Sequence, residues 1–148
     1  MVALSEERRA LILPYILEWA RKGADVSGSR AVFGFNQTME MRKSCGRLMQ
    51  KVDAVISPTN PIVSYPADWA SPTNDPQLPF EHIAFTVPWN MSEQPASSIN
   101  CGFSKSGMPI GLQIVGPRYQ DLFVLKLSKA FEDWSGGVKH WPQPPARG

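Results

Sequence analysis

Proline is the residue that most constrains this chain, because its prolines are concentrated in one stretch. Eight of the 14 fall between Pro58 and Pro95. Proline lacks a backbone N–H and disrupts helix interiors and central strands, so this stretch cannot belong to a helical bundle. The same region is also nearly free of positive charge, with no Lys or Arg from Val52 to Ser104. We therefore predict a single partial domain over 1–148 with three parts: a helical segment (1–52), a strand with a proline-rich loop (53–95), and a hairpin, a helix and an extended tail (96–148).

The first part has the start and stop signals of helices. Ser5 is followed by two glutamates, as expected for a helix N-cap with an acidic first turn. Pro14 should end or kink that helix, or begin a second one that stops near Gly23. A third helix of about 22 residues, capped by Ser27 or Ser29, is predicted from apolar residues at helical spacing. These residues are Val32, Phe35, Met39, Cys45, Leu48, Met49 and Val52.

Three short apolar runs are typical of strands: 54–57, 96–103 and 108–115. Lys105-Ser106-Gly107 joins the last two as a hairpin turn. A final helix should be capped by Asp121 and end at Gly136-Gly137, with Leu122, Leu125, the stem of Lys126, Phe131 and Trp134 on or near one side. The fold class is therefore α/β, with helices packed on a small mixed sheet that cannot close on itself.

Composition excludes several kinds of site and partner. A net charge of +2 does not favour a nucleic acid or a membrane surface as partner, and two cysteines are too few for a four-ligand metal site. We expect no metal and no cofactor. Cys45 and Cys101 are predicted to be packed thiols, although a Cys–His–Asn arrangement of Cys101 with His82 and either Asn90 or Asn100 is formally possible. His82 is interpreted as a structural hydrogen-bonding residue, far in sequence from the other histidine, His140.

The serines and tryptophans give weaker signals. Ser97 and Ser98 are neighbours in a strand, so they should point to opposite faces and cannot serve one site together. Trp69, Trp89 and Trp141 could line a pocket or belong to the core.

Nothing in the sequence resembles a signal peptide, and the longest apolar run, 10–16, is too short to span a bilayer. We predict a cytoplasmic protein.

Four segments, taken in order, resemble the amidase signature family. Asp53-Ala-Val-Ile-Ser-Pro-Thr59 is similar to a strand of that family that ends in Pro-Thr. Phe85-Thr-Val-Pro-Trp-Asn90 with Gln94-Pro-Ala96 is similar to its Phe-Thr-x-Pro-x-Asn…Gln-Pro-Ala segment. The glycine-rich run from Gly107 to Gly116 resembles its closing hairpin, and 121–132 its following helix. The resemblance covers the C-terminal third of those enzymes and implies the C-terminal part of their fold.

The same resemblance implies amide hydrolysis by a Ser–cis-Ser–Lys triad, with an acyl-enzyme and an oxyanion held by backbone amides. This sequence contains no Gly-Gly-Ser-Ser run, and none of its lysines stands in the family's catalytic context. No catalytic residue can therefore be assigned, and whether the chain is itself an enzyme stays open. We expect a C-terminal fragment of an amidase, inactive alone, that contributes scaffold and a wall of the pocket for a small amide.

The resemblance also suggests pocket residues. Trp69, Ile83, Trp89 and Asn90 are the candidates for the pocket wall. In the glutamine-using branch of the family, an Asp seven residues before the Asn contacts the substrate's amino group, and here that position is Ile83. An apolar or aryl amide is the expected substrate. Glu93 occupies a position where the family usually has Gly, a departure that could define a subgroup.

A second interpretation is a non-catalytic structural or interaction domain that associates with itself. Three strands left alone would expose unpaired edges and apolar faces. A homodimer, or another homo-oligomer, is therefore the expected assembly.

Overall fold

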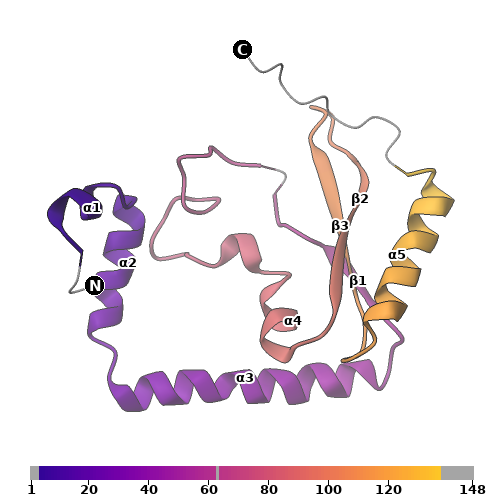
Figure 1. The fold of residues 1–148 in the computed structure, drawn as a ribbon, viewed down its shortest axis with the longest axis horizontal. Coiled ribbons are helices and arrows are strands. Elements are labelled where there is room, and N and C mark those ends of the chain that lie inside the picture. Colours follow the sequence, from indigo (N-terminus) through magenta and orange to yellow (C-terminus); the bar gives the residue numbers. More distant parts are fainter. Residues whose placement is uncertain (1–3, 63, 138–148) are drawn as a thin grey trace.

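The computed structural model describes residues 4–62 and 64–137, and the predictions for His140, Trp141 and the tail lie outside them. The described chain contains helices and three strands that form one sheet (Figure 1). The elements are α1 (Glu6–Ala10), α2 (Pro14–Ala24), α3 (Gly28–Met49), β1 (Val55–Pro58), the 3-10 helix η1 (Glu81–Ile83), α4 (Val87–Ser92), β2 (Ala96–Phe103), β3 (Pro109–Val115) and α5 (Asp121–Ser135). The predicted α/β class is confirmed.

The N-terminal helices begin where their cap residues indicated. The Ser5 and Ser27 hydroxyls accept hydrogen bonds from the amides of Arg8 and Arg30, at 3.4 and 3.3 Å. Pro14 is the first residue of α2, so it begins this helix rather than kinking a longer one. The helix continues one residue beyond the predicted stop at Gly23.

The sheet has the strand order β1-β3-β2, and both pairings are antiparallel. The hairpin turn makes β2 and β3 antiparallel. The predicted mixed sheet would need a parallel pair, but among the described strands β1 also lies antiparallel to β3, with Val55 opposite Val115. A bulge between Asn100 and Gly102 interrupts the register of β2 and β3, and Gly102 has a φ of 147° that suits glycine.

This bulge makes the prediction of a packed thiol at Cys101 wrong. Cys101 lies at the bulge of an outer strand and is exposed, and its thiol donates to the carbonyl of Ile110 at 3.5 Å. Cys45 is only 6% exposed, as predicted.

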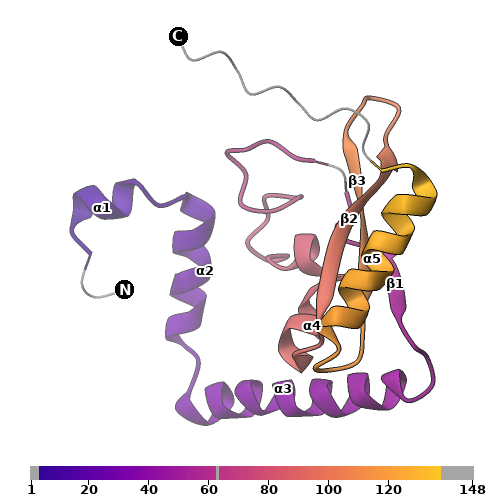
Figure 2. The same ribbon diagram turned by 45° about the vertical axis from the view of Figure 1, so that its right-hand side comes forward.

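The core lies where α5 covers one face of the sheet (Figure 2). Ile114 and Val124 are 1% and 3% exposed, and the hydroxyls of Ser97 and Ser128 are 2.6 Å apart across this contact. The apolar side predicted for the last helix is not the side that packs on the sheet, because three of its residues are exposed. Leu122, Leu125 and Trp134 are 64%, 62% and 82% exposed. Asp121 is the first helical residue and not the cap, which is Gln120.

The long helix α3 packs through its C-terminal half only. Cys45 contacts α4, where its thiol lies 3.9 Å from the carbonyl oxygen of Pro88. The apolar side chains of the first half face solvent, with Val32 61% and Phe35 74% exposed. No helix within the described ranges is long and apolar enough to cross a membrane.

Candidate functional site

The sheet face opposite α5 is polar. Strand pairing places Ser57, Gln113 and Ser98 side by side across the three strands. The side chain of Gln113 is 3% exposed and donates to Ser57 Oγ at 3.0 Å and to the carbonyl of Phe85 at 2.8 Å. Gln113 thereby holds the segment before α4 against the sheet.

Three of the four predicted pocket residues lie on either side of this contact, with Ile83 in η1 before it and Trp89 and Asn90 in α4 after it. The Thr86 hydroxyl donates to the carbonyl of Ile83 at 3.2 Å, and the carbonyl of Thr86 accepts from the amides of Trp89 and Asn90 at 3.2 and 3.1 Å. Ile83 and Trp89 are half-buried, whereas Asn90 is exposed. Backbone hydrogen bonds around Thr86 thus fix Ile83, Trp89 and Asn90 relative to one another.

Trp69 lies apart from them in sequence, in the loop that follows β1. Its amide donates to the carbonyl of Pro66 at 3.0 Å, and its side chain is 39% exposed. The neighbouring Asp68 helps to line a cavity of about 300 Å³ between α2 and the loop. The lining residues are Leu13, Pro14, Tyr15, Glu18, Asp68, Asn74 and Pro76. Trp69 thus belongs to the loop after β1, whereas the other three candidates lie on η1 and α4.

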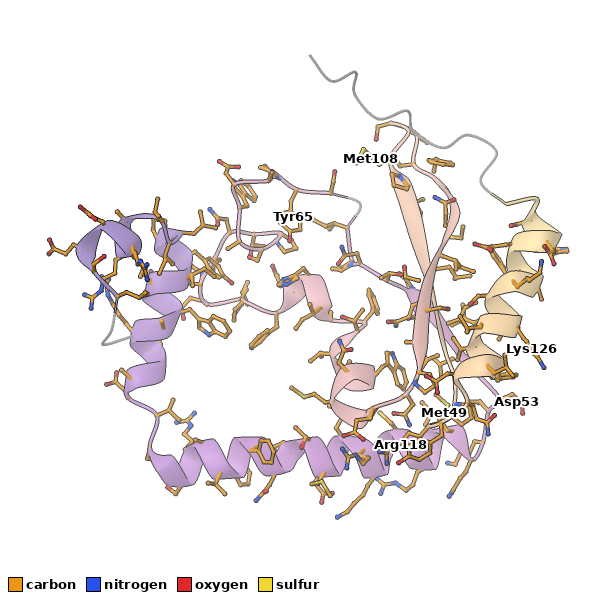
Figure 3. All side chains as sticks on the ribbon, in the orientation of Figure 1. Met49, Asp53, Tyr65, Met108, Arg118 and Lys126 are labelled. Atoms are coloured by element: carbon orange, nitrogen blue, oxygen red, sulfur yellow. The ribbon has the colours of Figure 1, made fainter. Side chains whose placement is uncertain are left out.

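A second cavity of about 300 Å³ lies where the end of α3 meets the segment between β3 and α5. Its walls are formed by Met49, Val52, Asp53, Pro117, Gln120 and Phe123. Met49 and Asp53 are marked in Figure 3, as is Arg118, which follows one of the wall residues in sequence. The walls are mostly apolar, with one carboxylate and one amide.

The most highly charged contact near the site was missed by the sequence analysis. Glu93, directly after α4, forms ion pairs with Arg42 of α3 and with Arg118 of the segment after β3. Only the unusual side chain at a position that favours glycine pointed to Glu93. Its arginine partners are 51 and 25 residues away in sequence, so local patterns could not identify them.

The remaining chemistry-bearing residues do not form a reactive group. Both cysteine thiols donate to backbone carbonyls, and the buried Nδ1 of His82 has no hydrogen-bond partner, so its predicted role as a hydrogen-bonding residue is not supported at this atom. No group of three metal-ligating side chains occurs within residues 4–62 and 64–137. Ser97 and Ser98 contact opposite sides of the sheet, through Ser128 and Thr59 respectively.

The family can be assigned from the order of these elements and from comparison with known proteins. The sequence profile of the family "Amidase" matches residues 5–125. The chain belongs to the amidase family. A glutamyl-tRNA(Gln) amidotransferase subunit from Alkaliphilus metalliredigens is 33% identical over 113 residues, which cover 74% of this chain and 23% of that protein.

Solved structures agree with this assignment. A bacterial aryl acylamidase of the amidase signature family superimposes with a TM-score of 0.72 and 25% identity, covering 88% of this chain and 28% of that one. A 6-aminohexanoate cyclic dimer hydrolase gives a TM-score of 0.71 at 25% identity, covering 95% and 31%. The chain spans about a fifth of the length of the curated relatives it matches, 18% and 23% for two of them.

Proposed function

We propose that this chain is part of an amide hydrolase, in which it supplies scaffold and one wall of the substrate pocket. The match of the amidase family to residues 5–125 carries this proposal. The wall consists of Ile83, Trp89 and Asn90 on the segment that Gln113 holds against the polar sheet face. Trp69 contributes from the neighbouring loop. The partner of the wall is a small carboxylic amide.

The catalytic groups belong to another part of the enzyme in this proposal. The sequence has no Gly-Gly-Ser-Ser run from which a serine nucleophile could come. Nucleophilic catalysis needs a nucleophile and a base within hydrogen-bond reach, and the described thiols and histidine do not provide this pair. The chain alone is therefore catalytically silent.

The proposed substrate is an apolar or aryl amide. Ile83 is half-buried, and its own carbonyl accepts a hydrogen bond from the Thr86 hydroxyl. Its side chain offers no charge to bind an amino group. An isoleucine pairs with an apolar acyl or aryl group at no desolvation cost, whereas a ligand ammonium would lose water without gaining a partner. The similarity to an aryl acylamidase agrees with this preference. Curated relatives named as glutamyl-tRNA(Gln) amidotransferase subunits make glutamine the alternative to test.

The first experiment assays the purified chain with 4-nitroacetanilide, benzamide and glutamine. No turnover above the buffer rate is expected. Turnover that disappears on mutation of one residue of this chain would contradict the assignment of catalysis to another part of the enzyme.

The second experiment uses the complete enzyme that contains this segment, with Ile83→Asp and the matched control Ile83→Leu. Ile83→Asp should lower kcat/KM for the anilide by about tenfold or more, since one buried contact contributes ~1–3 kcal/mol to discrimination. Ile83→Leu should stay within about threefold of the wild type. Wild-type glutaminase activity comparable with the anilide activity would refute the substrate preference.

A self-associating domain is the second candidate, and the exposed face of α3 favours it. Val32, Phe33 and Phe35 are 61%, 67% and 74% exposed on the N-terminal half of α3, which lies away from the sheet in Figure 1. Apolar side chains gathered in this way indicate an interaction surface. Light scattering of the chain should show a dimer, and Phe35→Glu should shift it to monomer. A compact monomer at micromolar concentration would exclude this candidate.

A further inference from the structure

Glu93 adopts a backbone conformation that non-glycine residues rarely adopt. Its φ of 62° and ψ of 33° lie in the left-handed region, directly at the end of α4. In this conformation the amides of Glu93 and Gln94 both donate to the carbonyl of Trp89, the latter at 3.2 Å. Such a left-handed residue is the usual way to close a helix, and glycine usually provides it. The conformation of Glu93 therefore directly fixes the backbone of Trp89.

The carboxylate of Glu93 connects this turn to two distant parts of the chain. One carboxylate oxygen accepts from Arg42 of α3 and the other from Arg118 of the segment after β3. Figure 3 shows Arg118 beside the C-terminal half of α3. The two arginine side chains are 30% and 29% exposed, and their Nε atoms are buried. Partial burial of both cations makes these charge-assisted contacts stronger than ordinary surface pairs.

The ion pairs Glu18–Lys22, Glu40–Lys43 and Lys129–Asp133 differ in kind. Each of them joins residues three or four apart on one helix, as Lys129 and Asp133 do on α5. A pair of that kind stabilises its own helix and fixes nothing else. The contacts of Glu93 span 51 and 25 residues and join α3, the end of α4 and the segment after β3. We name Arg42, Glu93 and Arg118 the arginine clamp.

We propose that Glu93 is a positioning residue, which uses the arginine clamp to hold the left-handed turn that orients Trp89 and Asn90. The clamp compensates for a side chain where the backbone favours glycine. That Trp89 and Asn90 then border an amide substrate rests on the proposed function. The clamp itself depends only on the contacts of this chain.

The test compares Glu93→Gln, which keeps the side-chain shape, with Glu93→Gly, which removes the backbone cost together with the clamp. Asp133→Asn is the matched control, because it breaks an exposed ion pair within one helix. NMR measures hydrogen exchange at the amide of Gln94. Fluorine NMR of chain labelled with 5-fluorotryptophan follows Trp89, whose signal is assigned with Trp89→Phe. Trp134, 82% exposed on α5, is the internal reference.

Glu93→Gln should speed exchange at Gln94 by about tenfold and shift the Trp89 signal, with Trp134 and the control unchanged. Glu93→Gly should speed exchange at Gln94 less than Glu93→Gln does, because glycine favours the left-handed turn. Adding about 0.5 M NaCl should raise the exchange rate at Gln94 in the wild type toward that of Glu93→Gln, since salt screens the partly exposed ion pairs. Exchange at Gln94 in Glu93→Gln as slow as in the wild type, with an unmoved Trp89 signal, would overturn the clamp.

The complete enzyme separates this proposal from the proposed function. Glu93→Gln should raise KM for the anilide several-fold with kcat nearly unchanged. If exchange and the Trp89 signal respond while KM does not, the clamp stands and the pocket wall is refuted. If neither the exchange at Gln94 nor the Trp89 signal changes in Glu93→Gln, the clamp is refuted, whatever the effect on activity.

Discussion

Gly111 of β3 shows how tightly a single position is determined by its neighbours. A Cβ atom built there would lie 2.8 Å from Thr59 Oγ1 and 3.1 Å from both Ser98 Oγ and Thr59 Cβ. The two hydroxyls are themselves hydrogen-bonded at 2.7 Å, so neither moves away freely. We expect Gly111→Ala to lower the free energy of unfolding by about 1–3 kcal/mol, the usual cost of overpacking. Urea unfolding followed by circular dichroism measures this change.

Gly34→Ala is the control for this substitution. Gly34 lies within α3, and a Cβ there meets nothing within 4 Å. Because alanine is the better helix former, this change should raise the free energy of unfolding by about 1 kcal/mol. If both substitutions changed stability with the same sign, the close approach at Gly111 would not be the cause.

Residue-scale features with local causes could be predicted from sequence. Ser5 and Ser27 cap their helices through residues three positions away, and Gly136 ends α5 with a φ of 79°. The requirements at Gly111 and Glu93 could not be predicted in this way. Both arise from residues that are distant in sequence and that meet only in the folded chain.

At the scale of elements, the packing of α5 on the sheet depends on few side chains. Val124 is 3% exposed, and its Cγ2 lies so close to Gly116 that a Cβ there would be 2.7 Å from it. We expect Val124→Ala to lower the free energy of unfolding by about 2 kcal/mol, through lost burial and a remaining cavity. Leu125→Ala, at a 62% exposed position, should change it by about 0.5 kcal/mol or less. Equal losses in thermal or urea unfolding would contradict this orientation of the helix.

The strands and helices were located from the sequence more accurately than their faces. The predicted strands 54–57 and 108–115 differ by one residue from β1 and β3. Apolar spacing grouped Leu125 with other exposed residues of α5, whereas the helix meets the sheet through Val124 and a hydrogen bond between Ser128 and Ser97. A buried serine has no apolar signature, so hydrophobic periodicity cannot place it.

In the candidate site, too, the residues could be located from the sequence, but their contacts could not. The segment that carries Ile83, Trp89 and Asn90 was found through its resemblance to the amidase signature family, and hydrogen bonds around Thr86 hold these residues together. The role of these residues as a pocket wall stays a prediction. Their support by Gln113 comes from strand pairing and could not have been read from local sequence.

At the scale of the whole molecule, stability is unevenly distributed. The sheet and α5 share the most buried side chains, including Ile114 and Val115. The helix α2 lies at the other end of α3, beside the proline-rich loop, as Figure 1 shows. Trp19 meets Phe80 edge-to-face at 5.4 Å, and Tyr15 is 8% exposed with a hydroxyl that lacks a hydrogen-bond partner. Regions with few buried contacts open before the core does.

We therefore expect two levels of protection in hydrogen exchange followed by mass spectrometry. Amides of α2 should exchange at least about tenfold faster than those of β3, because local opening of α2 leaves the sheet intact. Trp19→Ala removes an aromatic contact that contributes about 0.5–1.5 kcal/mol beyond its burial, so it should speed exchange in α2 further while β3 stays unchanged. Trp134→Ala, on the exposed side of α5, is the matched control and should leave hydrogen exchange in both segments unchanged.

If Trp19→Ala raised exchange equally in α2 and β3, the two ends of the molecule would unfold as one cooperative unit. The edge-to-face contact would then stabilise the whole chain and not the attachment of α2 alone.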